Sequence, residues 1–123
     1  MDHQPVDPGF SLTPAICHIL LVLADGERHG YAIMQAVMQA TDGAVQLGPG
    51  TLYRSIRVML THGLIVETES RPDPALDDER RRYYCLTDLG KRVLQAEIER
   101  ISRILKLAQT KPLLNPSQTG GPV

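Results

Sequence analysis

Hydrophobic residues recur every three or four positions in the first part of the chain, which predicts amphipathic helices. The first helix starts at Thr13 and Pro14, because threonine is a favourable N-cap and proline fits the first helical position. It ends at Gly26, a residue that accepts the left-handed conformation typical of helix ends. A second helix of about three turns starts at Gly30 and ends at residues 41–43.

A third helix begins near Gly48, where Gly48 or Thr51 can act as the N-cap and Pro49 suits the first turn, and it stops at Gly63. Its predicted apolar face consists of Leu52, Ile56, Met59 and Leu60. The positions expected to be exposed are Tyr53, Arg54, Ser55, Arg57 and Thr61. No Asp or Glu occurs between residues 43 and 66, so the outer face of this helix is basic and suits a DNA groove.

After Gly63 the pattern becomes β-branched and alternating, which predicts strands at residues 64–69 and 83–87. The segment between them, Arg71 to Glu79, is rich in Pro and Asp and is expected to form the hairpin loop, since proline cannot pair in a central strand. Tyr84 and Leu86 are expected to fill the core with Leu64 or Val66, while Tyr83 points to the other face. The predicted fold class is mainly α with a small β-hairpin, a winged helix-turn-helix.

A long helix follows, capped by Thr87 and running to about Thr110, where Lys111-Pro112 ends it. Its hydrophobic residues have the spacing of a coiled-coil seam, widened by Ile104 and Leu107. The residues of this seam are Leu94, Ile98, Ile101, Leu105 and Ala108. Nothing else in so short a chain can cover the seam, so a second copy is the expected partner and the helix is a dimerisation helix.

The predicted organisation has four parts. A flexible tail at 1–11 precedes the winged helix-turn-helix at 12–88, and the dimerisation helix at 89–110 precedes a second flexible tail at 111–123. A length of 123 residues agrees with one compact domain.

The distribution of charge along the chain, rather than the net charge, indicates the function. The formal net charge is −1, which by itself disfavours a nucleic-acid partner. However, the charges are segregated: residues 1–53 carry one basic and five acidic side chains, whereas residues 80–123 carry nine basic and three acidic ones. The basic residues therefore concentrate on the third helix, the end of the hairpin and the last helix.

Several function classes lack support in the sequence. No apolar run is long enough to span a membrane, and the first ten residues contain no Lys or Arg, so we expect a cytoplasmic protein. Cys17 and Cys85 show no metal-ligand spacing, which argues against a zinc site or a disulfide framework, and no cofactor is expected. Cys17 and His18 are adjacent on a helix and point about 100° apart, so they cannot form a nucleophile–base pair. An enzyme is the least favoured class.

Four motifs resemble, in order and spacing, the PadR family of bacterial transcriptional regulators. They are His29 to Ile33, Gly50 to Tyr53, His62 to Ile65, and Arg82 to Gly90. The resemblance spans roughly residues 12 to 108, and the single C-terminal helix is similar to the shorter PadR subfamily. It implies a homodimeric repressor that places the helix from Thr51 to Thr61 in the major groove and uses the hairpin as a wing. It also implies a response to small hydrophobic or phenolic compounds near the dimer interface.

The sequence departs from this family in two places. It contains no Trp, the residue with which some members stack a ligand. The tip of its wing is acidic, which argues against phosphate contact there; the acids are Asp73, Asp77, Asp78 and Glu79.

The residues expected to contact DNA fall into three groups. Arg54 and Arg57 would read base edges, and Thr51 and Tyr53 would hold the helix against the duplex. His29 and Tyr31 open the second helix, where backbone N–H groups favour phosphate. The wing would contribute Arg80, Arg81 and Arg82.

Each group also has a simpler interpretation. Arg54 and Arg57 could merely make a helix face soluble, Arg80 to Arg82 could pair with the loop acids, and Tyr31 could be a packing residue. A winged-helix module that binds protein is the alternative function. We favour DNA because a protein-docking face should have apolar or aromatic anchors at its centre, and the third helix presents mostly polar residues.

Overall fold

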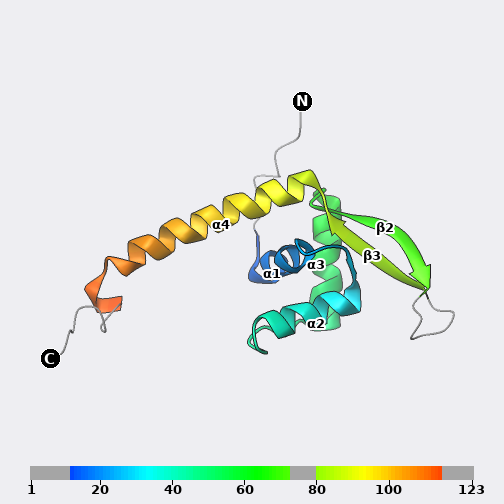
Figure 1. Ribbon diagram of the computed structural model, residues 1–123, viewed down its shortest axis with the longest axis horizontal. Helices are drawn as coiled ribbons and strands as arrows, with labels where there is room; N and C mark the ends of the chain where they lie inside the picture. Colours follow the sequence, from blue (N-terminus) through cyan, green and yellow to red (C-terminus); the bar gives the residue numbers. More distant parts are fainter. Residues whose placement is uncertain (1–11, 73–79, 115–123) are drawn as a thin grey trace.

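The computed structural model describes residues 12–72 and 80–114. Within these ranges the chain forms helices α1 (Pro14–Leu23), α2 (Gly30–Ala40), α3 (Pro49–Thr61) and α4 (Asp88–Gln109), with a short 3-10 helix, η2, at Pro112–Leu114 (Figure 1). A three-stranded antiparallel sheet is made of β1 (Arg28–His29), β2 (Ile65–Pro72) and β3 (Arg80–Leu86). The predicted winged helix-turn-helix with a long C-terminal helix is confirmed. The acidic wing tip and the outer parts of both predicted tails lie outside the described residues.

Side-chain N-caps begin α1, α2 and α4; the cap of α2 is His29. Thr13 Oγ1 accepts a hydrogen bond from the Ile16 N–H (3.1 Å) at the start of α1, and Thr87 Oγ1 accepts one from the Gly90 N–H (3.0 Å) at the start of α4. Both caps were predicted from the sequence, because hydroxyl side chains satisfy N–H groups that have no partner within the helix. Helix α3 begins differently: Gly48 is its N-cap residue and Pro49 stands at its first position.

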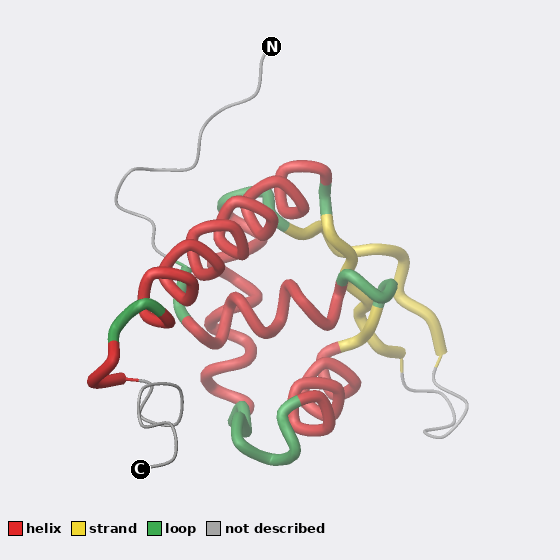
Figure 2. Tube along the Cα trace, turned by 60° about the vertical axis from the view of Figure 1, so that its left-hand side comes forward, coloured by secondary structure: helices red, strands yellow, loops and turns green. Residues whose placement is uncertain are grey.

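The core lies where α1, α2 and α3 pack together and against the sheet (Figure 2). Its fully buried side chains include Ile19, Leu20, Ile33, Val37, Leu52, Met59 and Leu64. On α3 the sequence analysis was wrong at two positions. Ser55 was expected to be exposed but is buried (8% exposed), and Leu60 was expected to be buried but is 37% exposed. Angular position explains both: on the helical wheel Ser55 lies between the half-buried Val58 and the buried Met59, whereas Leu60 lies between Ile56 and the exposed Tyr53.

The sheet differs from the predicted hairpin in two respects. First, Arg28 and His29 form an additional strand, β1, that pairs with Tyr84 and Tyr83 and makes β3 the central strand. Second, β2 does not stop before the predicted loop. After an irregularity between Thr68 and Arg71, its last two residues pair with the beginning of β3. Proline is tolerated at position 72 because β2 is an edge strand.

The side chains of the sheet follow the predicted alternation only in part. Tyr84 and Leu64 are buried and Leu86 is half-buried, whereas Val66 is 48% exposed. Tyr83 is half-buried rather than fully exposed, because its ring meets His29 of β1 edge-on, with 5.3 Å between ring centroids. The additional strand therefore extends the hairpin along the free edge of β3 and brings His29 beside Tyr83.

Helix α4 begins against the core and then leaves it (Figure 1). Leu94 is 5% exposed and belongs to the core of the winged domain. From Ile98 onward the large hydrophobic side chains of α4 are exposed. The described part of the chain therefore has one packed domain with a projecting helix.

Candidate nucleic-acid interface

The outer face of α3 carries two arginines close to each other. Arg54 and Arg57 are both exposed and are three positions apart, so their side chains lie on neighbouring parts of one helix face. Tyr53 is half exposed on the same face, and Thr51 is half-buried in the first turn. Neither guanidinium group forms an ion pair with another described residue. These donors are thus available for a ligand.

Tyr53 joins this face to the start of α2. Its ring lies against Gly30, where a methyl group would be 2.9 Å from Tyr53 Oη and 3.3 Å from Cε1. Gly30 is buried, and it is the first residue of α2. The absence of a side chain at Gly30 therefore leaves room for the Tyr53 ring against the start of α2.

The start of α2 is capped by His29. Its Nδ1 atom accepts a hydrogen bond from the Ala32 N–H at 3.1 Å, so one of the backbone N–H groups expected to face phosphate is already used. His29 is half-buried, and Tyr31, two residues later, is 49% exposed. Among the predicted DNA contacts at this helix, the Tyr31 side chain is the more accessible.

The base of the wing contains an ion pair across its two strands. Arg82 of β3 lies 3.7 Å from Glu67 of β2, measured from Nε to Oε2, and its side chain is 72% exposed. Glu67 pairs in register with Tyr84, so Arg82 is its diagonal neighbour on the same face. The prediction that wing arginines pair with acids thus applies to Arg82, but with an acid of β2. Arg80 and Arg81 are in β3, and their side chains lie outside the described residues.

Burial changes the pKa of Tyr84, which is paired with Glu67 across the two strands. Removal from water, followed by the negative charge of Glu67, raises the pKa of Tyr84, while Arg82 acts in the opposite direction. Tyr53 contributes a smaller increase to the same pKa. Tyr84 therefore stays neutral and belongs to the packed support of the face rather than to its charged surface.

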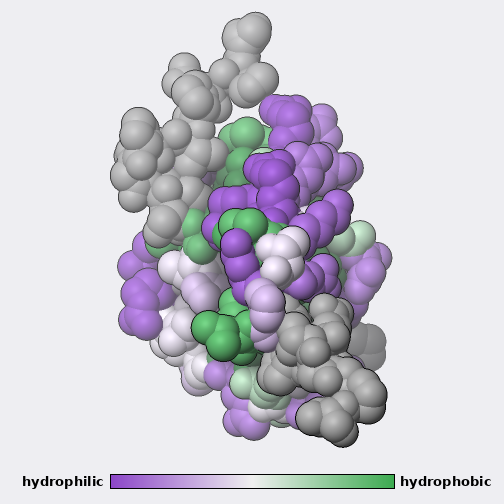
Figure 3. All heavy atoms as spheres, turned by 90° about the vertical axis from the view of Figure 1, so that its left-hand side faces the viewer, coloured by the Kyte–Doolittle hydropathy of each residue, from purple (hydrophilic) through white to green (hydrophobic). Residues whose placement is uncertain are grey.

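The predicted dimerisation residues divide into two groups. Leu94 packs into its own domain, whereas Ile98 and Ile101 are each 44% exposed and Leu105 is 55% exposed. Ala108 is half-buried. Ile104 and Leu107 widen this stripe, as the sequence indicated. Figure 3, viewed from the side toward which α4 extends, shows hydrophobic side chains exposed between strongly hydrophilic ones.

Other chemistry finds little support in the described residues. Residues 12–72 and 80–114 hold no group of three or more His, Cys, Asp or Glu side chains that could bind a metal ion. His18 Nδ1 lies 2.7 Å from Pro14 O within its own helix, in keeping with the inference that His18 does not activate Cys17. Burial, followed by the charge of Glu97, raises the pKa of the Cys17 thiol, so its reactive thiolate is disfavoured. In the same ranges no helix combines the length and apolar composition needed to cross a membrane.

Comparison with known proteins decides the family. A sequence model of the "Transcriptional regulator PadR-like family" matches residues 19–96, more than half of the chain. The chain belongs to the PadR-like family of transcriptional regulators. Because its members regulate transcription, the expectation that the protein is not an enzyme is confirmed.

Relatives of this PadR-like protein include an uncharacterised 37.1 kDa protein of a Streptomyces fradiae transposon. The two are 34% identical over 86 residues, which is 70% of this chain but only 22% of that protein. A PadR family transcription regulator from Clostridium difficile has the same fold, with a TM-score of 0.67, 24% identity, and coverage of 80% of this chain and 97% of that one. PadR of Bacillus subtilis, solved in complex with operator DNA, matches with a TM-score of 0.60, 22% identity, and coverage of 68% of this chain and 45% of that one.

The sequence analysis did not predict the roles that three residues have in the structure. Gly30 was assigned only to a helix start, and Glu67 only to a strand. Gly63 was assigned to a helix end, although its carbonyl also accepts a hydrogen bond from Thr87. The pairing register of the hairpin could have indicated the Glu67–Arg82 contact. The other two depend on how helices pack, for which a single sequence has no local signal.

Proposed function

We propose that this PadR-like protein binds double-stranded DNA as a homodimer and represses transcription from an inverted-repeat operator. In this proposal α3 enters the major groove, with Arg54 and Arg57 on base edges and with Thr51 and Tyr53 fixing the start of the helix. His29, Tyr31 and Arg80 to Arg82 are the residues we propose for phosphate contact. The operator complex of Bacillus subtilis PadR supports DNA as the ligand, through shared fold and family.

One observation carries the proposal: the two exposed arginines of α3 have no acidic partner among the described residues. On a surface that serves only solubility, charges of both signs are usually mixed. An acidic residue beside either arginine would then be no disadvantage. A guanidinium fork kept free on a helix face instead suits bidentate contact with guanine O6 and N7.

Footprinting on the DNA upstream of the gene tests this function. Protection of two half-sites related by a two-fold axis, with centres about 10 bp or a multiple apart, is expected because dimer symmetry imposes operator symmetry. Binding to every duplex with equal affinity, or protection of a single half-site, would contradict it.

The homodimer is proposed from the exposed stripe on α4. Ile98, Ile101 and Leu105 are exposed on a helix that projects from its domain. Exposed apolar stripes of this kind on soluble proteins mark interaction surfaces. A second α4 offers the same stripe, so the two surfaces are self-complementary under a two-fold axis.

We further propose that a small hydrophobic or phenolic compound releases the protein from DNA. A cavity of about 320 Å³ lies where the winged domain meets α4. Its lining includes the apolar residues Leu23 and Leu86 and the charged residues Asp25, Glu27 and Lys91. An effector acts only if it prefers the arrangement of the dimer that does not fit DNA. Phenolic compounds and cationic dyes that raise the melting temperature should therefore also release operator DNA; binding without release would contradict this role.

A protein partner is the second candidate, because one surface groove is apolar. A cavity of about 220 Å³ beside α2 is lined by Tyr31, Met34, Gln35, Met38, Gln46 and Leu47. Methionines and a tyrosine are common anchors of protein interfaces. If the variant with Met34→Gln and Met38→Gln still binds DNA, the groove is not needed for DNA binding. That function would then belong to α3, and the groove would be available to another partner.

A further inference from the structure

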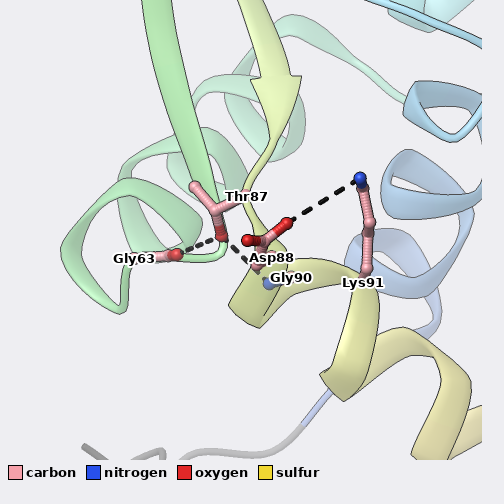
Figure 4. Close-up of polar contacts among 5 residues, drawn as sticks. All are labelled: Gly63, Thr87, Asp88, Gly90 and Lys91. Carbon is pink, nitrogen blue, oxygen red and sulfur yellow. Dashed lines mark hydrogen bonds and ion pairs between the residues drawn. The ribbon is translucent and has the colours of Figure 1, made fainter. Parts of the chain in front are cut away.

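The end of α3 is tied to the beginning of α4 by one threonine. The Thr87 hydroxyl donates a hydrogen bond to Gly63 O at 2.6 Å and accepts one from the Gly90 N–H at 3.0 Å (Figure 4). Thr87 also donates from its backbone N–H to Leu64 O at 3.1 Å. The hydroxyl thus both donates and accepts a hydrogen bond, and the bond it donates reaches a residue 24 positions earlier in the chain.

The α3 side of this connection is itself rigid. Gly63 has φ +73°, the Gly63 N–H donates to Leu60 O (3.1 Å), and the Leu64 N–H donates to Met59 O (2.9 Å). This pair of bonds is a Schellman motif, which ends a helix in a fixed direction. Leu64 is fully buried. The two carbonyl groups that Thr87 engages therefore follow directly from the last turn of α3.

On the α4 side, Gly90 packs directly against the backbone that follows α3 because it has no side chain. Gly90 is buried in the first turn of α4, and a methyl group there would overlap the carbonyl oxygen of Leu64. That obstacle is backbone in the packed core, which cannot move aside as a flexible side chain can. Any larger residue at position 90 must tilt or shift α4 relative to α3.

We infer that Thr87 and Gly90 are specificity-determining residues that set the distance between operator half-sites. The inference rests on the proposed function: α4 joins the protomers and α3 reads DNA, so the angle between α4 and α3 decides how far apart the two α3 helices lie. Thr87 and Gly90 fix that angle within each protomer. They contact no base, and they select DNA by separation rather than by base sequence.

Two variants and two controls test the inference. Thr87→Val keeps the shape of the side chain and removes both hydroxyl contacts, and Gly90→Ala adds the overlapping methyl group. Thr87→Ser restores the hydroxyl. Thr13→Val removes an N-cap of the same kind from α1, where the hydroxyl accepts from the Ile16 N–H at 3.1 Å within its own helix.

The first measurement needs no DNA. Spin labels at Gln39→Cys and Gln109→Cys, in a Cys17→Ser, Cys85→Ser background diluted with unlabelled protein, report the distance between α2 and the end of α4 in one protomer. We expect one narrow population for the parent, Thr87→Ser and Thr13→Val, and a broadened or shifted one for Thr87→Val and Gly90→Ala. An unchanged population in both variants would overturn the inference.

The second measurement varies the separation of two half-sites in a DNA library. The parent should prefer one separation, and Thr87→Val should reduce that preference by roughly tenfold, the effect expected from losing two hydrogen bonds, while affinity for an isolated half-site is unchanged. An unaltered separation preference together with a broadened distance distribution also overturns the inference. If no variant, parent included, binds DNA while the distances change as expected, the proposed function fails and the role of Thr87 and Gly90 in holding α4 stands.

Discussion

Tyr53 Oη of α3 would lie only 2.9 Å from a methyl group placed on Gly30 of α2, so the outer face of α3 and the preceding helix are in close contact at this point. The contact is made by the far end of the tyrosine, which can swing outward. A larger residue at position 30 should therefore move Tyr53 without unfolding the domain.

Gly30→Ala should weaken DNA binding by roughly tenfold, equivalent to about 1.4 kcal/mol, through displacement of Tyr53. Its stability should change by less than about 1 kcal/mol, because alanine is also the better helix former. The measurement is a double-mutant cycle with Tyr53→Ala, followed by DNA titration and thermal unfolding. Once Tyr53 is absent, Gly30→Ala should have no further effect on affinity; an equal loss in both backgrounds would refute the contact's role.

Ile101→Asp should dissociate the dimer. Burial of one such side chain is worth about 1.5–3 kcal/mol, and the variant adds a charge that would be buried without a partner. Sedimentation should show the 13.6 kDa protomer where the parent has twice that mass. Arg92→Asp is the matched control, because it places the same charge on an exposed position of the opposite side of α4. Equal masses for both variants would exclude the stripe as the interface.

Arg82→Ala should weaken matched and scrambled duplexes alike and reduce the slope of log affinity against log salt by about one, as expected for loss of one phosphate contact. Glu67→Gln should do the reverse, since it removes the carboxylate that lies 3.7 Å from Arg82. Titrations at two salt concentrations provide both quantities. A selective loss on the matched site alone would show that Arg82 reads bases.

The ion pair between Glu97 and Arg100 predicts a dependence of stability on pH. Hydrogen bonds from Arg100, at 2.9 and 2.5 Å, hold the pKa of Glu97 below its usual value. A lowered folded-state pKa stabilises the protein above the pKa of the unfolded chain, and this stabilisation disappears as the pH falls through the folded-state pKa. Glu97→Gln should thus lower the melting temperature slightly at neutral pH and not in strong acid. Glu99→Gln, on the exposed surface of the same helix, is the control; an equal loss for Glu97→Gln at both pH values would contradict the ion pair's role.

Much of the fold could be predicted because its signals are local. Thr13 with Pro14, and Thr87 with the residues after it, mark helix starts through contacts within one turn, and the exposed arginines of α3 follow from helical periodicity. The missed features depend on contacts distant in sequence. Strand β1 has two residues and exists because β3 is beside it.

Ser55 shows a different limit. Its polarity suggested exposure, but its angular position on α3 decides its burial. The same distinction applies to the joint between helices: Thr87 was predicted as a cap, whereas its bond to Gly63 could be seen only once α3 and the sheet were placed.

Titration of the Arg54→Ala, Arg57→Ala variant against matched and scrambled duplexes tests the central claim most directly. Each bidentate arginine–guanine contact is worth about 1–3 kcal/mol of discrimination, so loss of both contacts should reduce the preference for the matched site by at least ~30-fold in each half-site, while the variant still folds and dimerises. Arg92→Ala, Arg103→Ala removes the same charge from exposed positions of α4 and should keep the preference. Unchanged affinity and unchanged preference in the α3 variant would contradict DNA reading by this helix and favour the protein-binding alternative.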